Sequence, residues 1–216
     1  MRNHTPLSWG LDALREQQPD LRERPSSDGS LVLEGPVEFR GRNTDHGEVH
    51  EHFEVRLKVP DKFPRELPSV WELGGRIPPG FHTNLDDKSL CLGSPLQLFI
   101  ELNAEPTLVG FVNRCLLPYF YNFVVGERTG TLPFGELAHG RKGLLSEYQR
   151  LLGARDAATT RALFHLLSVK KRIANKRPCP CGSGRRVGRC HHRFLNPLRK
   201  VHARSWFATH LGTLGS

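Results

Sequence analysis

Thiol and imidazole groups are concentrated in one short segment, RPCPCGSGRRVGRCHH (residues 177–192). The residues with metal-ligand chemistry are Cys179, Cys181, Cys190 and His191. Tetrahedral zinc prefers thiolate and imidazole ligands, and a turn at Gly182 and Gly184 lets two cysteines two residues apart face one ion. The sequence therefore predicts a structural zinc site, with His192 as the alternative to His191 for the fourth ligand. Because so small a segment buries little apolar area, we expect metal binding to supply its stability.

The same segment resembles the SEC-C motif, a short zinc-binding element appended to many bacterial proteins. The resemblance implies a docking role without catalysis, because four protein ligands leave no open position on the metal for water. Basic stretches lie before, within and after the motif: KKRIANKR, RRVGR and RFLNPLRK. We expect them to contact an acidic protein surface or a nucleic acid.

A second group of chemistry-bearing residues lies in FHTNLDDKSLCLGSP, where His82 and Asn84 precede a lone Cys91. A thiolate is a strong nucleophile and a good leaving group, so a cysteine thioester keeps a carboxyl group activated for attack by an amine. A neutral amide such as that of Asn84 can donate to the resulting oxyanion, which is worth about 10² to 10³ in rate when it is preorganised. We interpret Cys91 as a nucleophile and His82 as structural.

Each of these assignments has an alternative. Cys91 could be a small buried apolar side chain, as Cys115 is predicted to be on its helical stripe. Asn84 could stabilise the loop by bonding to nearby backbone groups. Asp86 and Asp87 could attract or deprotonate an incoming lysine, but we interpret them as ordinary turn residues.

The segments around this loop have the patterns of strands followed by helices. Alternation of apolar and charged residues, clearest from Phe53 to Val59, predicts strands over 30–39, 51–60 and 69–73. Helical spacing predicts helices over 6–18, from 106 onward, over 144–152 and over 156–176, with a kink or split at Pro118. RERPSSDGS is predicted to be a turn-rich connector. The order indicates an α+β fold with an antiparallel meander sheet and flanking helices.

Roughly residues 5–150 resemble ubiquitin-conjugating enzymes, which have the UBC fold. The resemblance rests on this element order, on Phe63–Pro64 followed by LPSV, and on HTNL before the Cys-Leu pair. It implies that His82 braces the loop, Asn84 serves the reaction and Cys91 accepts an acyl group as a thioester. The sequence departs from the family at Thr83, where the family has proline, and around Lys88, where the family has glycine. The spacing from Asn84 to Cys91 is also about one residue short.

The resemblance implies a bacterial-type transferase of the cytoplasm. Its acyl donor would be the C-terminus of a ubiquitin-like protein, or a nucleotidyltransferase in an anti-phage (CBASS-type) defence system. Because the chain contains no adenylating motif, a separate activating enzyme would supply the activated carboxyl group. A protein lysine would be the acceptor. The departures leave open a catalytically inactive UBC-fold binding or adaptor protein. A zinc-containing nucleic-acid-binding protein is a further alternative.

Charge and cysteine usage divide the chain of 216 residues unequally. Residues 157–216 contain thirteen Lys and Arg and no Asp or Glu, which leaves 18 basic and 22 acidic residues, a net charge of −4, in residues 1–156. We therefore predict a UBC-like domain over 1–155 and a basic helical tail with a zinc knuckle over 156–216.

Five cysteines without a paired framework favour a reducing compartment. The most apolar window, beginning at Leu108, contains Asn113 and Arg114, which argues against a membrane span.

Three histidines in DHGEVHEHF raise a second metal hypothesis. His50 and His52 share one face of a predicted strand, and His46 precedes them. Two histidines on one face make an incomplete site, and no carboxylate or cysteine clearly completes it. We interpret them as solvated surface.

Overall fold

The computed structural model describes residues 9–43, 47–134 and 140–215, with the side chain of Asn43 excepted. Contacts divide the chain into two compact units, Met1–Glu136 and Leu137–Ser216. The boundary therefore lies earlier than the one predicted after residue 155. The helix that the sequence predicts over 144–152 belongs to the second unit.

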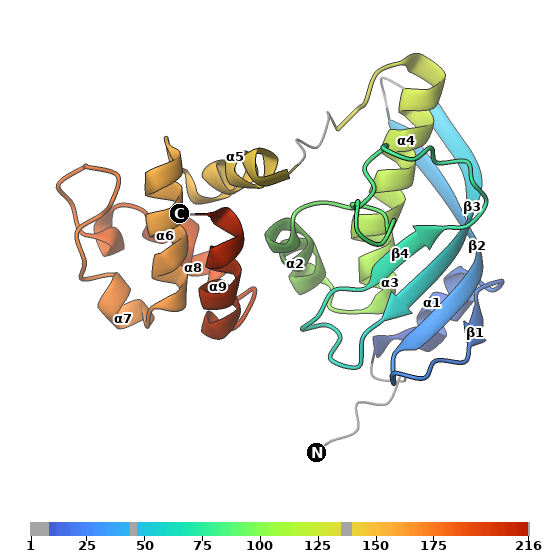
Figure 1. Cartoon of the computed structure of the whole chain (residues 1–216), viewed down its shortest axis with the longest axis horizontal. Helices are drawn as coiled ribbons and strands as arrows, with labels where there is room; N and C mark the ends of the chain where they lie inside the picture. The colour runs from blue at the N-terminus through green and yellow to red at the C-terminus, as the bar shows by residue number, and fades with distance from the viewer. Residues whose placement is uncertain (1–8, 44–46, 135–139, 216) are drawn as a thin grey trace. The chain divides into compact units, whose positions relative to one another are not determined.

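The first unit contains a four-stranded antiparallel sheet in the order β1-β2-β3-β4, a meander in which each strand pairs with its neighbour in sequence (Figure 1). Its strands are β1 (Arg22–Arg24), β2 (Leu31–Asn43), β3 (Gly47–Val59) and β4 (Ser69–Glu72). The predicted α+β class with an antiparallel sheet is confirmed at this level. β1 lies in the segment predicted to be a connector, because three exposed residues carry no alternation of apolar side chains.

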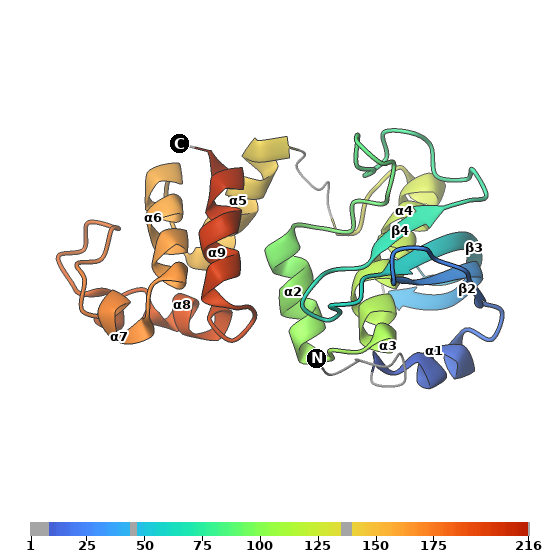
Figure 2. The ribbon, with the colours of Figure 1, turned by 60° about the horizontal axis from the view of Figure 1, so that its bottom comes forward.

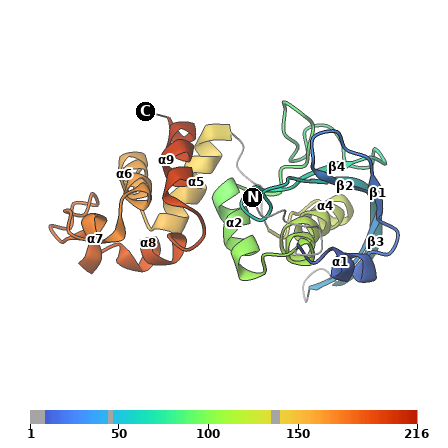
Figure 3. The same ribbon diagram turned by 90° about the horizontal axis from the view of Figure 1, so that it is seen from below.

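One face of the sheet packs on a long helix. This helix consists of α3 (Leu108–Phe111), a π-helical turn η2 (Val112–Leu116) and α4 (Leu117–Thr129). Figure 3 shows the sheet curving around it. Phe53 of β3 stacks on Phe120 of α4 with ring centroids 4.2 Å apart, so the alternation that predicts β3 also gives the core side of the sheet. The short helix α1 (Leu11–Gln17) contacts α3, and positions 6–8 of its predicted span lie outside the described residues.

Pro118 does not break this helix. It stands at the start of α4, directly after the π-helical turn, where the wider turn accommodates a residue that has no N–H. The predicted split is therefore a change of hydrogen-bond pattern within one continuous helix. Leu108–Thr129 is long and apolar enough to cross a membrane by composition, but 72% of its most apolar window is buried inside the structure.

A further helix, α2 (Pro95–Ala104), was not among the predicted elements. Its local signals are present in the sequence: the Ser94 hydroxyl caps it by accepting from the N–H of Gln97, and Pro95 occupies its first turn. Its buried side chains, Leu96, Phe99 and Leu102, follow helical spacing. It packs on α3 and η2 and follows directly from the loop that carries Cys91.

The second unit is helical. Its elements are α5 (Gly140–Leu152), α6 (Ala157–Ser168), α7 (Lys171–Ala174), η3 (Val187–Arg189), α8 (His192–Leu198), α9 (Arg204–His210) and η4 (Leu211–Leu214). Helix α6 is central and contacts α5, α7, α8, α9 and η4 (Figure 2). Tyr148 of α5 stacks on Phe164 of α6 with ring centroids 5.2 Å apart, and both are fully buried. The helix predicted over 156–176 ends at Ser168, and α7 is a separate turn.

Candidate functional site

Cys91 lies at the base of a small hairpin formed by residues 82–91. The N–H of Cys91 donates to the carbonyl of His82 at 2.7 Å, and the N–H of Asn84 donates to the carbonyl of Ser89 at 2.8 Å. Thr83 and Leu90 form the bridge between these bonds. The backbone bonds thus pair His82 with Cys91 and Asn84 with Ser89 across the hairpin. The structure thus brings the three predicted site residues into one local unit.

Two aromatic residues hold this hairpin on the body of the first unit. Tyr119 of α4 donates from its hydroxyl to the carbonyls of Phe81 and His82 at 3.1 and 3.3 Å. Trp71 of β4 donates from Nε1 to the carbonyl of Asp87 at 2.9 Å. The N–H of Leu90 also donates to Val70, which extends the sheet into the hairpin. Sequence reasoning missed Tyr119 and Trp71, because each is far from the loop in sequence and has an ordinary place in a helix or a strand.

The side chain of Asn84 takes part in the loop. Its Nδ2 donates to Ser89 Oγ at 2.8 Å, and Ser89 Oγ in turn donates to Asp87 Oδ1 at 2.7 Å. The Ser89 N–H and hydroxyl donate to Asp87 and lower its pKa. Asp87 therefore stabilises the turn, which agrees with the interpretation of this residue as a turn residue. Lys88, near the position at which the resembling family has glycine, has φ 62°, the left-handed conformation that glycine adopts most readily.

The two cysteines of the first unit have different environments. Cys91 is partly exposed, whereas Cys115 is buried on the helical stripe, as predicted for it. Burial raises the pKa of the Cys115 thiol to about 12. Burial also raises the pKa of Tyr119, and the charges of Cys91 and Glu72 add to this increase, so the Cys91 sulfur lies within electrostatic range of the Tyr119 hydroxyl. His82 is buried, with 4% of its surface exposed, which fits a bracing role.

In the second unit, four potential ligands converge. The ligand atoms of Cys179, Cys181, Cys190 and His191 all lie within 4.8 Å of one another. The Cys181 sulfur is 3.3 Å from that of Cys179 and 3.5 Å from that of Cys190, and His191 Nδ1 is 3.1 Å from the Cys179 sulfur. Two thiolates bound tetrahedrally to zinc would be roughly 3.8 Å apart. The cluster can therefore hold a tetrahedral metal ion with little adjustment.

A local hairpin places these ligands. The Cys179 N–H donates to the carbonyl of Arg185 at 2.8 Å, and Gly182 and Gly184 turn the chain with φ 76° and 69°. Both glycines have the left-handed conformation that the predicted turn requires. Hydrogen bonding, chiefly from Ser183, lowers the pKa of Cys181 to about 6, whereas burial raises that of Cys179 to about 12. All three thiols must lose their protons to bind a metal ion.

His191, and not His192, faces the cluster. Its Nε2 lies 3.1 Å from the carbonyl oxygen of Gly153, which can only accept, so Nε2 carries the proton and Nδ1 presents its lone pair to the sulfurs. His192 is exposed in the first turn of α8. No sequence signal connects Gly153 with His191, because the two residues lie on different elements 38 positions apart.

The cluster is part of a helical unit with its own apolar core, which differs from the expectation that bound metal provides the whole core. Val187 and Leu195, on either side of the last two ligands, are fully buried. Two of the thirteen basic residues of the tail also serve the fold: Arg199 donates to the carbonyls that end α6, and Arg161 donates to Leu214. The others are exposed, and they are Lys170, Lys171, Arg172, Lys176, Arg177, Arg185, Arg186, Arg189, Arg193, Lys200 and Arg204.

The strand histidines have surface positions. His50 and His52 are both exposed on β3, and among the described residues neither joins a group of three or more metal-ligating side chains. His46 lies outside the described residues.

Comparisons of the chain with protein-family models, curated proteins and solved structures find no match. The likeness to ubiquitin-conjugating enzymes and to the SEC-C motif therefore rests on the sequence motifs themselves. The structure adds a mixed α+β fold, a braced hairpin with a partly exposed cysteine, and a four-residue cluster able to hold a metal ion.

Proposed function

We propose that this protein is an acyltransferase of the ubiquitin-conjugating type, with Cys91 as its nucleophile. The observation that supports this most directly is the braced hairpin, which keeps a partly exposed thiol on the same supported loop as Asn84. A buried apolar role, the alternative for Cys91, fits Cys115 instead.

The proposed reaction has two acyl-transfer steps, a thiol–thioester exchange followed by aminolysis. The Cys91 thiolate attacks the carbonyl of a donor thioester, the tetrahedral intermediate expels the donor thiolate, and the acyl group is then bound to the Cys91 sulfur. A deprotonated lysine amine of the acceptor attacks this thioester, loses its second proton to solvent or a base, and expels the Cys91 thiolate. The product is an amide, and Cys91 returns unchanged.

Asn84 is the proposed donor to the developing oxyanion. Its amide nitrogen carries two hydrogens, and the bond to Ser89 uses one of them. This bond also orients the amide, which reduces the reorganisation needed during the reaction. The two interpretations of Asn84, loop support and catalysis, are thus compatible in this geometry.

The test uses ubiquitin bearing a C-terminal 2-mercaptoethanesulfonate thioester, which bypasses an activating enzyme. We expect the wild type and a Cys115→Ser control to form an adduct that dithiothreitol removes, and Cys91→Ser to form no such adduct. An equal reducible adduct on Cys91→Ser would contradict the proposal. Slow labelling of Cys91 by iodoacetamide, at the rate of Cys115, would favour the inactive binding protein instead.

We also propose that Cys179, Cys181, Cys190 and His191 hold a structural zinc ion. When bound, zinc would cross-link the hairpin to the start of α8, and all four positions would be filled by the protein. Metal content per chain should be one zinc, and a chelator should speed amide exchange in residues 179–191 before it affects α6. Retention of slow exchange in this segment after complete metal removal would argue against the role. Cys181→Ser should reduce the zinc content, while Cys115→Ser should leave it unchanged.

The exposed basic residues support one second candidate, a nucleic-acid-binding role for the second unit. Binding driven by phosphate contacts weakens steeply as salt concentration rises. A gel-shift series with duplex DNA and RNA at increasing salt measures this dependence. Absence of any retarded band at low salt would exclude the role.

A further inference from the structure

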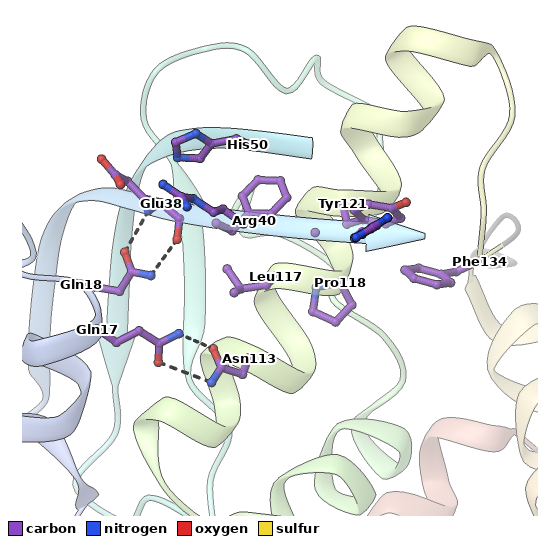
Figure 4. Close-up of a pocket in the computed structure, with 13 residues that line it drawn as sticks. Gln17, Gln18, Glu38, Arg40, His50, Asn113, Leu117, Pro118, Tyr121 and Phe134 are labelled. Atoms are coloured by element: carbon purple, nitrogen blue, oxygen red, sulfur yellow. Dashed lines mark hydrogen bonds between the residues drawn. The ribbon is translucent and has the colours of Figure 1, made fainter. Parts of the chain in front are cut away.

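A cavity of about 580 Å³ opens beside β2 in the first unit, away from the hairpin of Cys91 (Figure 4). One end is formed by Gln17 and Gln18 at the end of α1, and the other by Tyr121 and Phe134. Between them runs the edge of β2 from Glu38 to Arg42. None of these residues is used in the proposed acyl transfer.

The edge of β2 is open along this cavity. Among the described residues, β1 pairs with β2 at residues 32–34, and beyond them β3 is the one strand that pairs with β2. In an antiparallel pair, alternate residues direct both backbone groups toward the partner strand and the others direct both away. Glu34 faces β1, and by this alternation residues 36, 38, 40 and 42 face the open edge. Pro36 fits this position, because an edge-facing residue needs no N–H.

Gln18 pairs with the open edge of β2 as an added strand would. Its Nε2 donates to the Glu38 carbonyl at 2.8 Å, and its Oε1 accepts from the Glu38 N–H at 2.9 Å. One side-chain amide thus makes both bonds that the peptide groups of an added strand would make, as the dashed lines in Figure 4 show. Arg40 and Arg42 are the next edge-facing positions, and Glu38 to Arg42 spans about 13 Å of strand.

The charge of this edge selects an acidic occupant. Arg40 and Arg42 are exposed, and among the described residues no carboxylate forms an ion pair with either of them. His50 lies directly across from Arg40 in the register and also lines the cavity. Glu38, the one acidic residue in the lining, already has its backbone groups occupied by Gln18.

Tyr121 lies at the far end of the cavity. Tyr121 is 94% buried, since 6% of its surface is exposed, and its hydroxyl has no hydrogen-bond partner among the described residues. Its oxygen is shielded from solvent, so the partner segment makes its contacts with the strand edge and not with this hydroxyl. Its ring packs against Gly41 on the core side of β2, so this hydroxyl lies next to the same strand.

We propose that the open edge of β2 at Arg40 and Arg42 binds an extended, acidic segment of a partner protein as an added strand. Backbone bonds to the edge give the affinity, and carboxylates paired with Arg40, Arg42 and His50 give the selectivity. Leu117 and Pro118 supply an apolar floor next to Tyr121.

The experiment titrates three peptides into the full chain labelled with ¹⁵N and follows the backbone amides. The probes are a capped hexapeptide of alternating glutamate and valine, its twin with lysine in place of glutamate, and the acidic peptide with every backbone nitrogen methylated. We expect the acidic peptide to shift the amides of Arg40 and Arg42 most, and each of the other two to bind at least about tenfold more weakly. Arg40→Glu and Arg42→Glu together should weaken the acidic peptide by a similar factor, with Arg65→Glu as the control.

Each other outcome overturns the proposal. Equal binding of the N-methylated peptide would show that charge alone holds the segment, and equal binding of the basic twin would remove the acidic selectivity. No shift at Arg40 and Arg42 with any peptide would show that the edge is closed to strands. The three-peptide comparison uses the unaltered protein, so it decides the question even where a variant fails to fold.

Discussion

Replacing Gln18 with methionine removes the amide that pairs with Glu38 and keeps the length and apolar stem of the side chain. Gln18 is buried, with 3% of its surface exposed, and it makes two hydrogen bonds to the backbone of one residue, Glu38. Each such bond contributes about 0.5–1.5 kcal/mol net, so Gln18→Met should lower the free energy of unfolding of the first unit by about 1–3 kcal/mol. Gln17→Met is the matched control, because it removes an exposed side-chain pair with Asn113 worth a few tenths of a kcal/mol, roughly.

Urea unfolding followed by tryptophan fluorescence measures this difference. All variants carry Trp206→Phe, so that the signal comes from Trp9 and Trp71 of the first unit. With an ordinary slope for urea, the midpoint of Gln18→Met should fall by about 1 M, and that of Gln17→Met by much less. The Glu38 amide should also exchange with solvent faster in Gln18→Met. Equal midpoints for the two variants would refute the reasoning that Gln18 acts as a surrogate strand.

Three further predictions concern other parts of the chain. Gly41→Ala should destabilise the first unit by about 1–3 kcal/mol in the same urea assay, because an added Cβ would lie 2.5 Å from Tyr121 Cδ2; an unchanged midpoint would contradict this packing. Cys115 should resist iodoacetamide at pH 8 until denaturant is added, since its pKa near 12 leaves little thiolate, and mass spectrometry of labelled peptides would detect any early modification. Asp156 caps α6 by accepting from the N–H and hydroxyl of Thr159, which lower its pKa. Its contribution to stability should be complete above about pH 5 and lost as pH falls through the lowered pKa. Wild type and Asp156→Ala should therefore differ in melting temperature at pH 7, and the difference should shrink as pH falls below about 4.

Local patterns in the sequence were sufficient for much of the architecture. The alternation from Phe53 to Val59 predicts β3 and its buried face, because side chains on a strand can only point to one side or the other. The stripe from Leu108 to Phe120 predicts the core helix for the analogous reason. β1 was not predicted because its three exposed residues carry no repeat. Helix α2 was missed although Ser94 and Pro95 signal its start and its apolar residues have helical spacing.

Spacing predicts most of the potential metal-binding cluster, because Cys179 and Cys181 belong to one local hairpin with a glycine turn and Cys190 and His191 follow within ten residues of that turn. The choice between His191 and His192 could not be predicted from spacing, since it depends on the Gly153 carbonyl, which orients the His191 ring from the turn after α5. Neighbouring residues determine the local hairpin geometry, so it can be predicted from spacing. The contact between His191 and Gly153 joins residues 38 positions apart and leaves no pattern in the sequence.

The environment of each thiol and of each strand edge also depended on distant residues. Periodicity predicts that Cys115 is buried, but Cys91 lies in a loop, where exposure depends on how Tyr119 and Trp71 hold that loop. In the same way, nothing in the residues around Glu38 shows that β1 stops short and that Gln18 occupies the edge next to it. Composition and spacing decide which face a side chain takes, whereas the identity of its neighbour is decided only when remote elements pack together.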